Sequence, residues 1–201
     1  MNHRFHDREW VEKYAETITE RRPERVDMFA HIVGLIQNLD VENPTVIELA
    51  CGPGLLALAL LENVPEMRYI GVDFSEATLE VAQEKTEAFR DQCVFDCVDL
   101  CKAGWNGKLP SNVDAIVSNM ALHDLGDVAS VDAVYQTSLG HLRAGGLFVN
   151  AELVLNADEE HKDAGRCTAD RHLEMLKGAG YVQVDCPVDY GHYACVLGYR
   201  E

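Results

Sequence analysis

Residues 45–60, TVIELACGPGLLALAL, are the stretch that decides the fold. A short β-branched run ends at the acidic Glu48, and a turn with glycines at Gly52 and Gly54 leads into an apolar, helix-forming run. Glycines let bare backbone approach a ligand, and the N-terminus of a helix offers free N–H groups to it. The stretch therefore predicts a strand, a tight turn and a helix, which is where open α/β sheets bind nucleotide-like cofactors.

Outward from this stretch, short strands and helices alternate. Strands are expected at 45–50, 68–73, 92–97, 113–118 and 146–153, and helices at 54–63, 76–90, 128–143 and about 166–178. Such alternation predicts a doubly wound parallel α/β sheet with right-handed crossovers. The end of the chain differs, because two strand-like runs, 181–188 and 192–199, are separated only by a short turn. They predict an antiparallel hairpin.

The first 40 residues are expected to be helical and to lack strands. Trp10, Tyr14 and Ile18 recur at every fourth residue, and Pro23 interrupts the pattern before a second apolar stripe. We therefore expect residues 1–40 to form a helical arm or lid. Residues 41–201 would form the cofactor-binding core, within a single domain overall.

The composition narrows the class of partner. The 201 residues carry 17 basic and 34 acidic side chains, a net charge of −17, and 47% are hydrophobic. Proteins that bind phosphate backbones need a basic face, so nucleic acid and membrane are poor candidates and a small molecule is favoured. With no apolar signal segment and seven cysteines that lack zinc spacing, we expect a cytoplasmic protein with free thiols and no metal site. A homodimer stays open.

The spacing of the glycine turn bears on which cofactor it holds. The dinucleotide fingerprint G-x-G-x-x-G would need glycine at positions 50, 52 and 55, where the chain has Ala50, Gly52 and Leu55. An acid, a small residue and two glycines stand instead at Glu48, Ala50, Gly52 and Gly54. A nicotinamide-dependent oxidoreductase is therefore disfavoured, though it remains an alternative.

The glycine turn resembles motif I of the class I S-adenosylmethionine-dependent methyltransferases. Five further elements resemble this family in order, at 69–75, 93–100, 113–124, 142–148 and 173–181. The resemblance covers about residues 45–199 and implies a Rossmann-like, seven-stranded sheet of order 3-2-1-4-5-7-6. Such a sheet is mostly parallel, with an antiparallel strand from the C-terminal hairpin. The cofactor implied is S-adenosylmethionine, with S-adenosylhomocysteine as product.

The resemblance also implies which residues bind the cofactor. Asp73, about 20 residues after the turn, would accept hydrogen bonds from the ribose hydroxyls. Asp99 would lie near the adenine, with Asp96 as the competing choice, and Glu48 near the amino acid moiety. The expected cofactor-binding residues are Glu48, Ala50, Gly52, Gly54, Asp73, Phe74, Asp99, Leu100, Asn119, Met120 and, from the arm, Tyr14.

His123 is the candidate catalytic residue. It follows the fourth strand, at the edge where such sheets bind ligands, and an imidazole there could orient or deprotonate an acceptor near neutral pH. A loop histidine bonded to backbone is the alternative interpretation. Tyr190 and His192 in the hairpin turn and Arg22 in the arm are the candidates for substrate contact.

The function expected is S-adenosylmethionine-dependent methyl transfer to a small-molecule acceptor by in-line displacement. The protein would position the reactants, and a general base could assist. A cofactor-binding protein without catalysis, an oxidoreductase and a methyltransferase acting on protein or RNA are the alternatives. The net charge disfavours RNA, and residues 118–121, Ser-Asn-Met-Ala, lack the Asn/Asp-Pro-Pro-Tyr motif of amino-group methylation.

Overall fold

A computed structural model of the chain describes residues 3–156 and 165–201. The strands of these residues form a seven-stranded sheet of order β3-β2-β1-β4-β5-β7-β6. The Rossmann-like α/β fold, its strand order and its antiparallel last strand are thereby confirmed. The chain divides into two compact units, an N-terminal unit, Asn2–Asp99, and a C-terminal unit, Leu100–Glu201.

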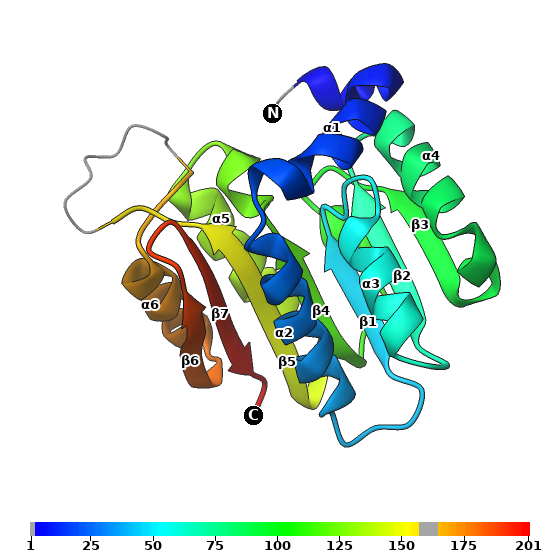
Figure 1. Cartoon of the computed structure of the whole chain (residues 1–201). Helices are drawn as coiled ribbons and strands as arrows, with labels where there is room; N and C mark the ends of the chain where they lie inside the picture. Colours follow the sequence, from blue (N-terminus) through cyan, green and yellow to red (C-terminus); the bar gives the residue numbers. More distant parts are fainter. Residues whose placement is uncertain (1–2, 157–164) are drawn as a thin grey trace. The chain divides into compact units, whose positions relative to one another are not determined.

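The N-terminal unit carries the helical arm and the first three strands. Its parallel strands pair as β1 with β2 and β2 with β3, and α1 lies alongside α4 (Figure 1). Its elements are the 3-10 helix η1 (His3–His6), α1 (Arg8–Arg21), α2 (Arg25–Gln37), β1 (Thr45–Leu49), α3 (Leu55–Asn63), β2 (Arg68–Asp73), α4 (Glu76–Lys85), η2 (Glu87–Gln92) and β3 (Cys93–Cys97).

Polar side chains cap the helices of this unit where the sequence supplies them. The Asp7 carboxylate accepts from the backbone N–H of Trp10 to begin α1, and the Ser75 hydroxyl accepts from that of Thr78 to begin α4. The helix expected over 76–90 ends early, at Lys85. Thr86 leaves the helical conformation and its hydroxyl donates to the Ala82 carbonyl, so that α4 ends and a 3-10 helix follows.

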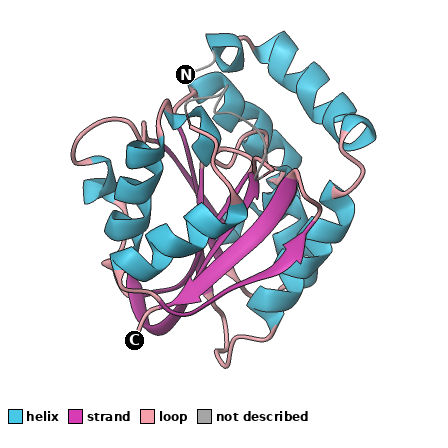
Figure 2. Cartoon of the chain, turned by 90° about the vertical axis from the view of Figure 1, so that its left-hand side faces the viewer, coloured by secondary structure: helices cyan, strands magenta, loops and turns pink. Residues whose placement is uncertain are grey.

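The C-terminal unit contains a mixed part of the sheet. Strands β4 and β5 are parallel, while β7 pairs antiparallel with both β5 and β6; the strands are magenta in Figure 2. Its elements are η3 (Trp105–Lys108), β4 (Val113–Asn119), η4 (Leu122–Leu125), α5 (Val128–Leu139), β5 (Leu142–Leu153), α6 (Ala169–Ala179), β6 (Val182–Asp189) and β7 (Tyr193–Tyr199).

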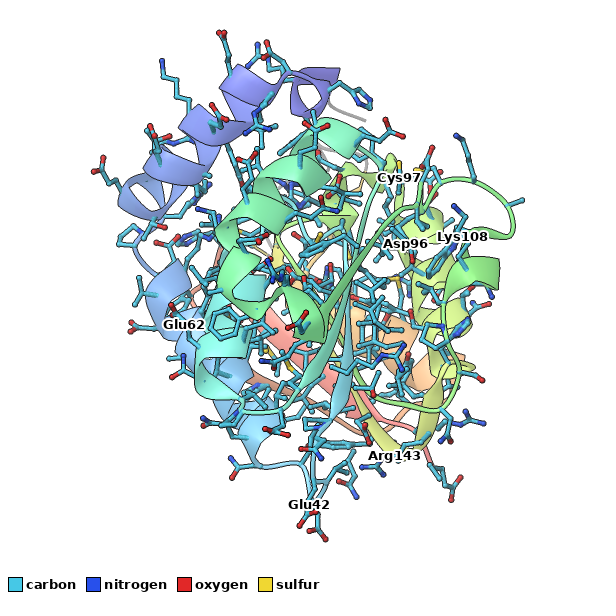
Figure 3. The ribbon with its side chains drawn as sticks, turned by 90° about the vertical axis from the view of Figure 1, so that its right-hand side faces the viewer. Glu42, Glu62, Asp96, Cys97, Lys108 and Arg143 are labelled. Carbon is cyan, nitrogen blue, oxygen red and sulfur yellow. The ribbon has the colours of Figure 1, made fainter. Side chains whose placement is uncertain are left out.

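Strand β5 begins earlier than expected, at Leu142 instead of residue 146, and α5 accordingly ends at Leu139 instead of residue 143. The pairing of β5 with β4 shifts register between Leu142 and Leu147, where Gly145 has φ +70°. This irregular start also lets Arg143 pair with Asp114 of β4 at 2.6 Å; Arg143 is labelled in Figure 3. Helix α6 begins at Ala169, later than the expected residue 166, because the Thr168 hydroxyl caps it.

Apolar side chains fill the interior of both units, as expected for strands covered on both faces. The buried polar residues of the strands are Glu48 in β1, Asp73 in β2, Asp114 and Ser118 in β4, and Asn150 and Glu152 in β5. Such residues need partners, because burying an unpaired polar group is costly. They mark the parts of the sheet where side chains form polar interactions in addition to packing.

The seven cysteines are free thiols, as expected. Burial is not general among them, because Cys97 and Cys101 are exposed whereas Cys51, Cys167 and Cys195 are buried. Within the described residues, no cluster of three or more His, Cys, Asp or Glu side chains is placed to hold a metal ion. Nor does any described helix combine the length and apolar character needed to cross a membrane.

Candidate functional site

The glycine turn after β1 uses its two glycines differently. A Cβ built on Gly52, where φ is +55°, would have nothing within 4 Å. A Cβ on Gly54, where φ is +75°, would lie 3.0 Å from the Cα of Ala82 in α4. Gly52 therefore leaves open space at the end of β1, as a cofactor-facing position would. Gly54 is needed for the close packing of α3 against α4, whatever else it contacts.

Two expected cofactor residues have left-handed backbones without being glycine. Ala50 has φ +53° and Met120 has φ +51°, each just beyond the carboxyl end of its strand. This conformation costs a non-glycine residue about 1–2 kcal/mol. Such strain is common at ligand sites, so both positions fit a functional strand end.

Asp73, the last residue of β2, lies directly against the glycine turn. Its Oδ2 accepts from the Gly52 N–H at 3.0 Å and its Oδ1 from the Ser75 N–H at 3.1 Å. Burial raises the pKa of Asp73 to about 6, although these backbone hydrogen bonds oppose the rise. Because each carboxylate oxygen has a second lone pair, Asp73 can still accept from two hydroxyl groups.

Strand β3 separates the two candidates for the adenine contact. Asp96 lies within β3 (Figure 3), whereas Asp99 follows the end of the strand. The intervening Val98 donates its N–H to the Asp73 carbonyl at 2.8 Å. Asp99 is thus the acid at the same sheet edge as Asp73, which favours it over Asp96. Leu100, the next residue, is buried.

Glu48 is buried within β1 and is 2% exposed. The Tyr69 hydroxyl donates to its Oε2 at 2.7 Å. Burial raises the pKa of Glu48 to about 8, while the hydrogen bond from Tyr69 and the charge of Arg25 lower it. With this pKa, Glu48 is mostly protonated at neutral pH even though the charge of Arg25 acts on it.

Segment η1 lies close to the residues that follow Asp73. The Phe5 carbonyl accepts from the hydroxyls of Ser75, at 2.6 Å, and Thr78, at 2.9 Å. The Phe74 ring meets the rings of Phe5 and His6, with centroids 6.4 and 5.0 Å apart. Segment η1 is thereby fixed to the N-terminus of α4.

The arm residues named from sequence have local partners. Tyr14 stacks on Trp10, with centroids 5.3 Å apart, and meets Phe5 edge-on at 5.5 Å. Arg22 lies 3.8 Å from Glu24. The contact of Tyr14 with the cofactor and that of Arg22 with the substrate stay predictions.

In the C-terminal unit, Asn119 and Met120 end β4 as expected. The Tyr193 hydroxyl of β7 donates to the Asn119 Oδ1, which fixes the orientation of this amide. Met120 donates its N–H to the Ala151 carbonyl of β5 at 2.8 Å. Tyr190 and His192 lie exposed at the hairpin turn, and their substrate contact also stays a prediction.

His123 is held by a buried carboxylate. Its Nδ1 lies 2.6 Å from Oε1 of Glu152 in β5, and its backbone N–H donates to Oε2 at 3.2 Å. The His123 side chain is 12% exposed and that of Glu152 1% exposed. Burial alone would lower the pKa of His123, but the charge and hydrogen bond of Glu152 outweigh it and raise the pKa. The pKa of Glu152 is correspondingly lowered despite burial.

A second buried cluster lies behind this pair. The Asn150 amide donates to the Tyr135 hydroxyl at 2.8 Å, and that hydroxyl lies 2.7 Å from the Nδ1 of His172. Burial lowers the pKa of His172, although the charge of Glu152 opposes this. Glu152 therefore faces one histidine that is stabilised as a cation and one that is kept neutral.

Sequence reasoning missed Glu152 and His172. A signal for Glu152 was present, because Asn150 and Glu152 interrupt an otherwise apolar strand, LFVNAELVL. Polar side chains in such a strand are expected to have buried partners. His172 lies on an amphipathic helix without a comparable signal.

Comparison with known proteins identifies the family. Residues 47–148, just over half of the chain, match a family model described as a methyltransferase domain. The chain is 32% identical over 135 residues to trans-aconitate 2-methyltransferase of Azoarcus sp., covering 67% of this chain and 49% of that protein. It is 31% identical over 101 residues to release factor glutamine methyltransferase of Streptomyces coelicolor, covering 49% of this chain and 34% of that protein.

Solved structures share the fold at low sequence identity. An O-methyltransferase family protein from Burkholderia thailandensis superimposes with a TM-score of 0.76 at 20% identity, covering 98% of this chain and 62% of that one. A structure of PigF with SAH gives a TM-score of 0.74 at 18% identity, covering 98% and 60%. The chain spans between 30% and 58% of the length of the first curated relatives it matches. It belongs to the class I S-adenosylmethionine-dependent methyltransferase family.

Proposed function

We propose that the protein transfers the methyl group of S-adenosylmethionine to a hydroxyl oxygen of a small-molecule acceptor, with His123 as general base. The observation that carries this proposal is the 2.6 Å contact between Nδ1 of His123 and the buried Glu152. A proton on Nδ1 that is shared with Glu152 leaves Nε2 as the nitrogen that can accept another. A hydroxyl becomes a strong nucleophile once a base removes its proton, so this arrangement suits methylation of oxygen.

The residues of the N-terminal unit fit the donor. Gly52 leaves room for close approach, Asp73 offers lone pairs to ribose hydroxyls, and Asp99 lies beyond the end of β3. When bound, S-adenosylmethionine supplies a methyl group on positively charged sulfur, already activated for displacement. The remaining work of the protein is to orient the acceptor and, at His123, to take its proton. Glu152 then stabilises the imidazolium that forms.

A small-molecule acceptor is favoured over a protein. Relatives of both kinds are similar to the chain, as the names trans-aconitate 2-methyltransferase and release factor glutamine methyltransferase indicate. The strand end of this chain, Asn119-Met120, lacks the Asn/Asp-Pro-Pro-Tyr sequence associated with methylation of amino groups. The His123–Glu152 pair supplies a base, which an acceptor hydroxyl needs.

The test is formation of S-adenosylhomocysteine with a panel of phenolic, catecholic and aliphatic hydroxyl compounds and a glutamine-containing peptide. We expect turnover with a hydroxyl compound. His123→Gln keeps a donor for Glu152 and should lower kcat by about 10²–10⁴-fold, with S-adenosylhomocysteine affinity within about twofold. Asp91→Asn, at an exposed side chain in η2, is the matched control. Turnover of the peptide alone would reject the acceptor class, and unchanged turnover in His123→Gln would reject the base.

A further inference from the structure

Tyr135 of α5 joins two buried polar side chains of the C-terminal unit. The Asn150 amide of β5 donates to the Tyr135 hydroxyl at 2.8 Å, and Nδ1 of His172 in α6 lies 2.7 Å from the same hydroxyl. All three residues are 0% exposed. Burying polar groups is costly, so a cluster of three calls for a role in addition to packing.

The single proton of the Tyr135 hydroxyl decides the state of His172. Because the Asn150 amide already donates to the hydroxyl oxygen, the proton is left to donate to Nδ1 of His172. The reverse direction, from Nδ1 to the hydroxyl, would leave this proton without an acceptor among the described residues. A ring nitrogen that accepts a hydrogen bond carries no proton, so the arrangement makes His172 neutral, with its proton on Nε2.

The surroundings of His172 also favour the neutral form. Within residues 3–156 and 165–201, its Nε2 has no hydrogen-bond partner, whereas a buried cation normally needs one. Burial lowers the pKa of His172, although the charge of Glu152 opposes this. The charged neighbours on α6, Arg171 and Glu174, are exposed and pair with each other at 2.9 Å.

Glu152 lies on the same face of β5 as Asn150, because alternate residues of a strand point to the same side. The pairing of β5 with β7 is regular over residues 147–153, so no bulge interrupts this alternation. His172, linked to Asn150 through one hydroxyl, therefore lies on the side of the sheet to which the Glu152 carboxylate points. That carboxylate is bonded to His123, with 2.6 Å between Oε1 and Nδ1. Two histidines thus lie on the side of one buried carboxylate.

We propose that Tyr135 is a positioning residue, whose hydroxyl keeps His172 uncharged and so leaves the Glu152 carboxylate to His123. A hydrogen bond to the neutral form of a group disfavours its charged form. Without that bond, a second cation would compete for Glu152 and repel the proton of His123. The role of Tyr135 in catalysis rests on the proposed function, because it takes His123 as the base.

The other titratable groups near these residues keep their charge when Tyr135 is replaced. Two act on His123, since the charge of Asp124, 3.9 Å from Nε2, raises its pKa and that of Arg166 lowers it. Burial raises the pKa of the two groups beside Tyr135, which stay neutral near pH 7; these are Cys167 and Tyr181. A changed titration of His123 on replacing Tyr135 therefore reports the charge of His172.

The experiment follows the titration of each histidine by NMR, in the full chain without donor or acceptor. Nitrogen chemical shifts of the imidazoles distinguish the two neutral tautomers from the cation, and His172→Gln and His123→Gln assign the signals. In the wild type we expect His172 to be neutral at pH 7 with its proton on Nε2. Tyr135→Phe should raise the titration midpoint of His172 by about 0.5–1 in pH and lower that of His123 by a smaller amount.

A double variant separates this role from a structural one. His172→Gln alone should leave the midpoint of His123 nearly in place, because His172 is neutral in the wild type. Tyr135→Phe/His172→Gln should return the His123 midpoint to its wild-type value, and the rising limb of kcat/KM against pH should follow the same order. The matched control is Tyr181→Phe, which removes a buried hydroxyl that donates to the Tyr135 carbonyl at 3.0 Å and should move neither midpoint.

Other outcomes overturn the proposal. A wild-type His172 that is cationic at pH 7, or protonated at Nδ1, would remove its basis. An unmoved His123 midpoint in folded Tyr135→Phe, or one that stays displaced in the double variant, would show that Tyr135 acts only through packing. If Tyr135→Phe does not fold, the wild-type tautomer of His172 and the His123 midpoint in His172→Gln decide. The expected midpoints in a protein that forms no S-adenosylhomocysteine would support the electrostatic arrangement and reject the proposed function alone.

Discussion

At the scale of single residues, Glu48 and Glu152 show how a hydrogen-bonding partner determines whether a buried carboxyl group is charged. Glu48 and Glu152 are 2% and 1% exposed. The pKa of Glu48 is raised to about 8 by burial, because its closest hydrogen-bond partner is the neutral Tyr69. Burial acts on Glu152 too, but the charge and hydrogen bond of His123 outweigh it and lower its pKa. Glu48 is thus mostly neutral at pH 7, whereas Glu152 is held as an anion by His123.

Glu152→Gln should therefore move the pH dependence of turnover. The pKa of His123 is raised by Glu152, so the wild-type rate should rise with pH through a value above 6.5, the ordinary value for histidine. Without the carboxylate, burial lowers the pKa of His123, and the rising limb should move to lower pH while kcat falls. The measurement is kcat/KM against pH, with Asp91→Asn, at an exposed side chain in η2, as the control that leaves the limb in place. An unmoved limb in Glu152→Gln would contradict the pairing.

The His123–Glu152 pair stabilises the folded protein in a pH-dependent way. Because the pKa of His123 is higher in the folded protein, the ion pair stabilises it fully below the unfolded pKa of 6.5. This stabilisation is lost as the pH rises through the folded pKa. Chemical denaturation of wild type and Glu152→Gln should accordingly give a difference in unfolding free energy that shrinks from pH 6 to pH 9. A difference that grows over this range would be inconsistent with a charged pair.

Glu48 predicts proton release when the donor binds. With a pKa of about 8, its carboxyl is mostly protonated at pH 7, and an ammonium group beside it would favour the ionised form. We expect binding of S-adenosylhomocysteine at pH 7 to release up to about one proton. Calorimetry in buffers of different ionisation enthalpy measures this number, and Glu48→Gln should abolish it. Equal release from both proteins would place the titrating group elsewhere.

Local spacing could predict some site residues and not others. Asp73 ends a strand and His123 follows one, and the neighbouring residues in sequence define both strands, so the sequence alone indicates their positions. The role of Glu152 depends on a partner 29 residues away, and the burial of His172 brings it to a partner, Tyr135, that is 37 residues away. Neither property leaves a periodic pattern, since burial and long-range pairing arise only when the elements pack.

At the scale of elements, the glycine turn combines close packing at Gly54 with open space for a ligand at Gly52, and mutation can separate the two. Gly54→Ala would bring a Cβ within 3.0 Å of the Ala82 backbone at a positive φ, so it should lower the unfolding free energy by about 2–4 kcal/mol. The Cβ of Gly52→Ala would lie in open space. Only the left-handed backbone conformation should therefore lower the unfolding free energy of this variant, by about 1–2 kcal/mol. Urea denaturation measures both.

The same two variants should differ in ligand binding. Gly52→Ala places a methyl group where the donor is expected to approach, so its affinity for S-adenosylhomocysteine should fall more than its stability suggests. Folded Gly54→Ala should bind nearly as the wild type does. The opposite ranking would mean that Gly54, and not Gly52, faces the ligand.

The start of the chain is attached to α4 by two hydroxyls, and Thr78→Val tests this attachment. The substitution keeps the shape but removes the bond to the Phe5 carbonyl, which contributes about 1 kcal/mol. Amide hydrogen exchange in α1 should become faster while exchange in β1 and β2 is unchanged. Binding of S-adenosylhomocysteine should slow exchange in the arm if it acts as the expected lid. Unaltered exchange in Thr78→Val would show that Arg8, paired with Glu80 and Glu84, is sufficient.

At the scale of the whole molecule, the strand order is the feature of the fold that the sequence pattern alone does not predict. Alternation of strands and helices predicts a parallel α/β sheet, and the short turn at Asp189–Gly191 predicts the hairpin, both from local pattern. The order β3-β2-β1-β4-β5-β7-β6 has no such local origin, and it came only from the resemblance to methyltransferases. Strand order depends on how crossovers connect distant segments. Local features, such as the end of α4 at Thr86 or the positive φ of Gly145 in β5, carry no information about these crossovers.

The net charge of −17 predicts a stability that increases with salt. The excess negative side chains repel one another more strongly in the folded state than in the expanded unfolded chain. Salt ions screen this repulsion over about 8–10 Å at physiological ionic strength. Raising NaCl from about 20 to about 300 mM should therefore raise Tm at pH 7.5, with most of the rise below about 150 mM. Differential scanning calorimetry at both salt concentrations measures this, with glycerol of equal osmolality as the control for solvent effects. A Tm that falls with salt would mean that local ion pairs, such as Arg8 with Glu84, outweigh the overall repulsion.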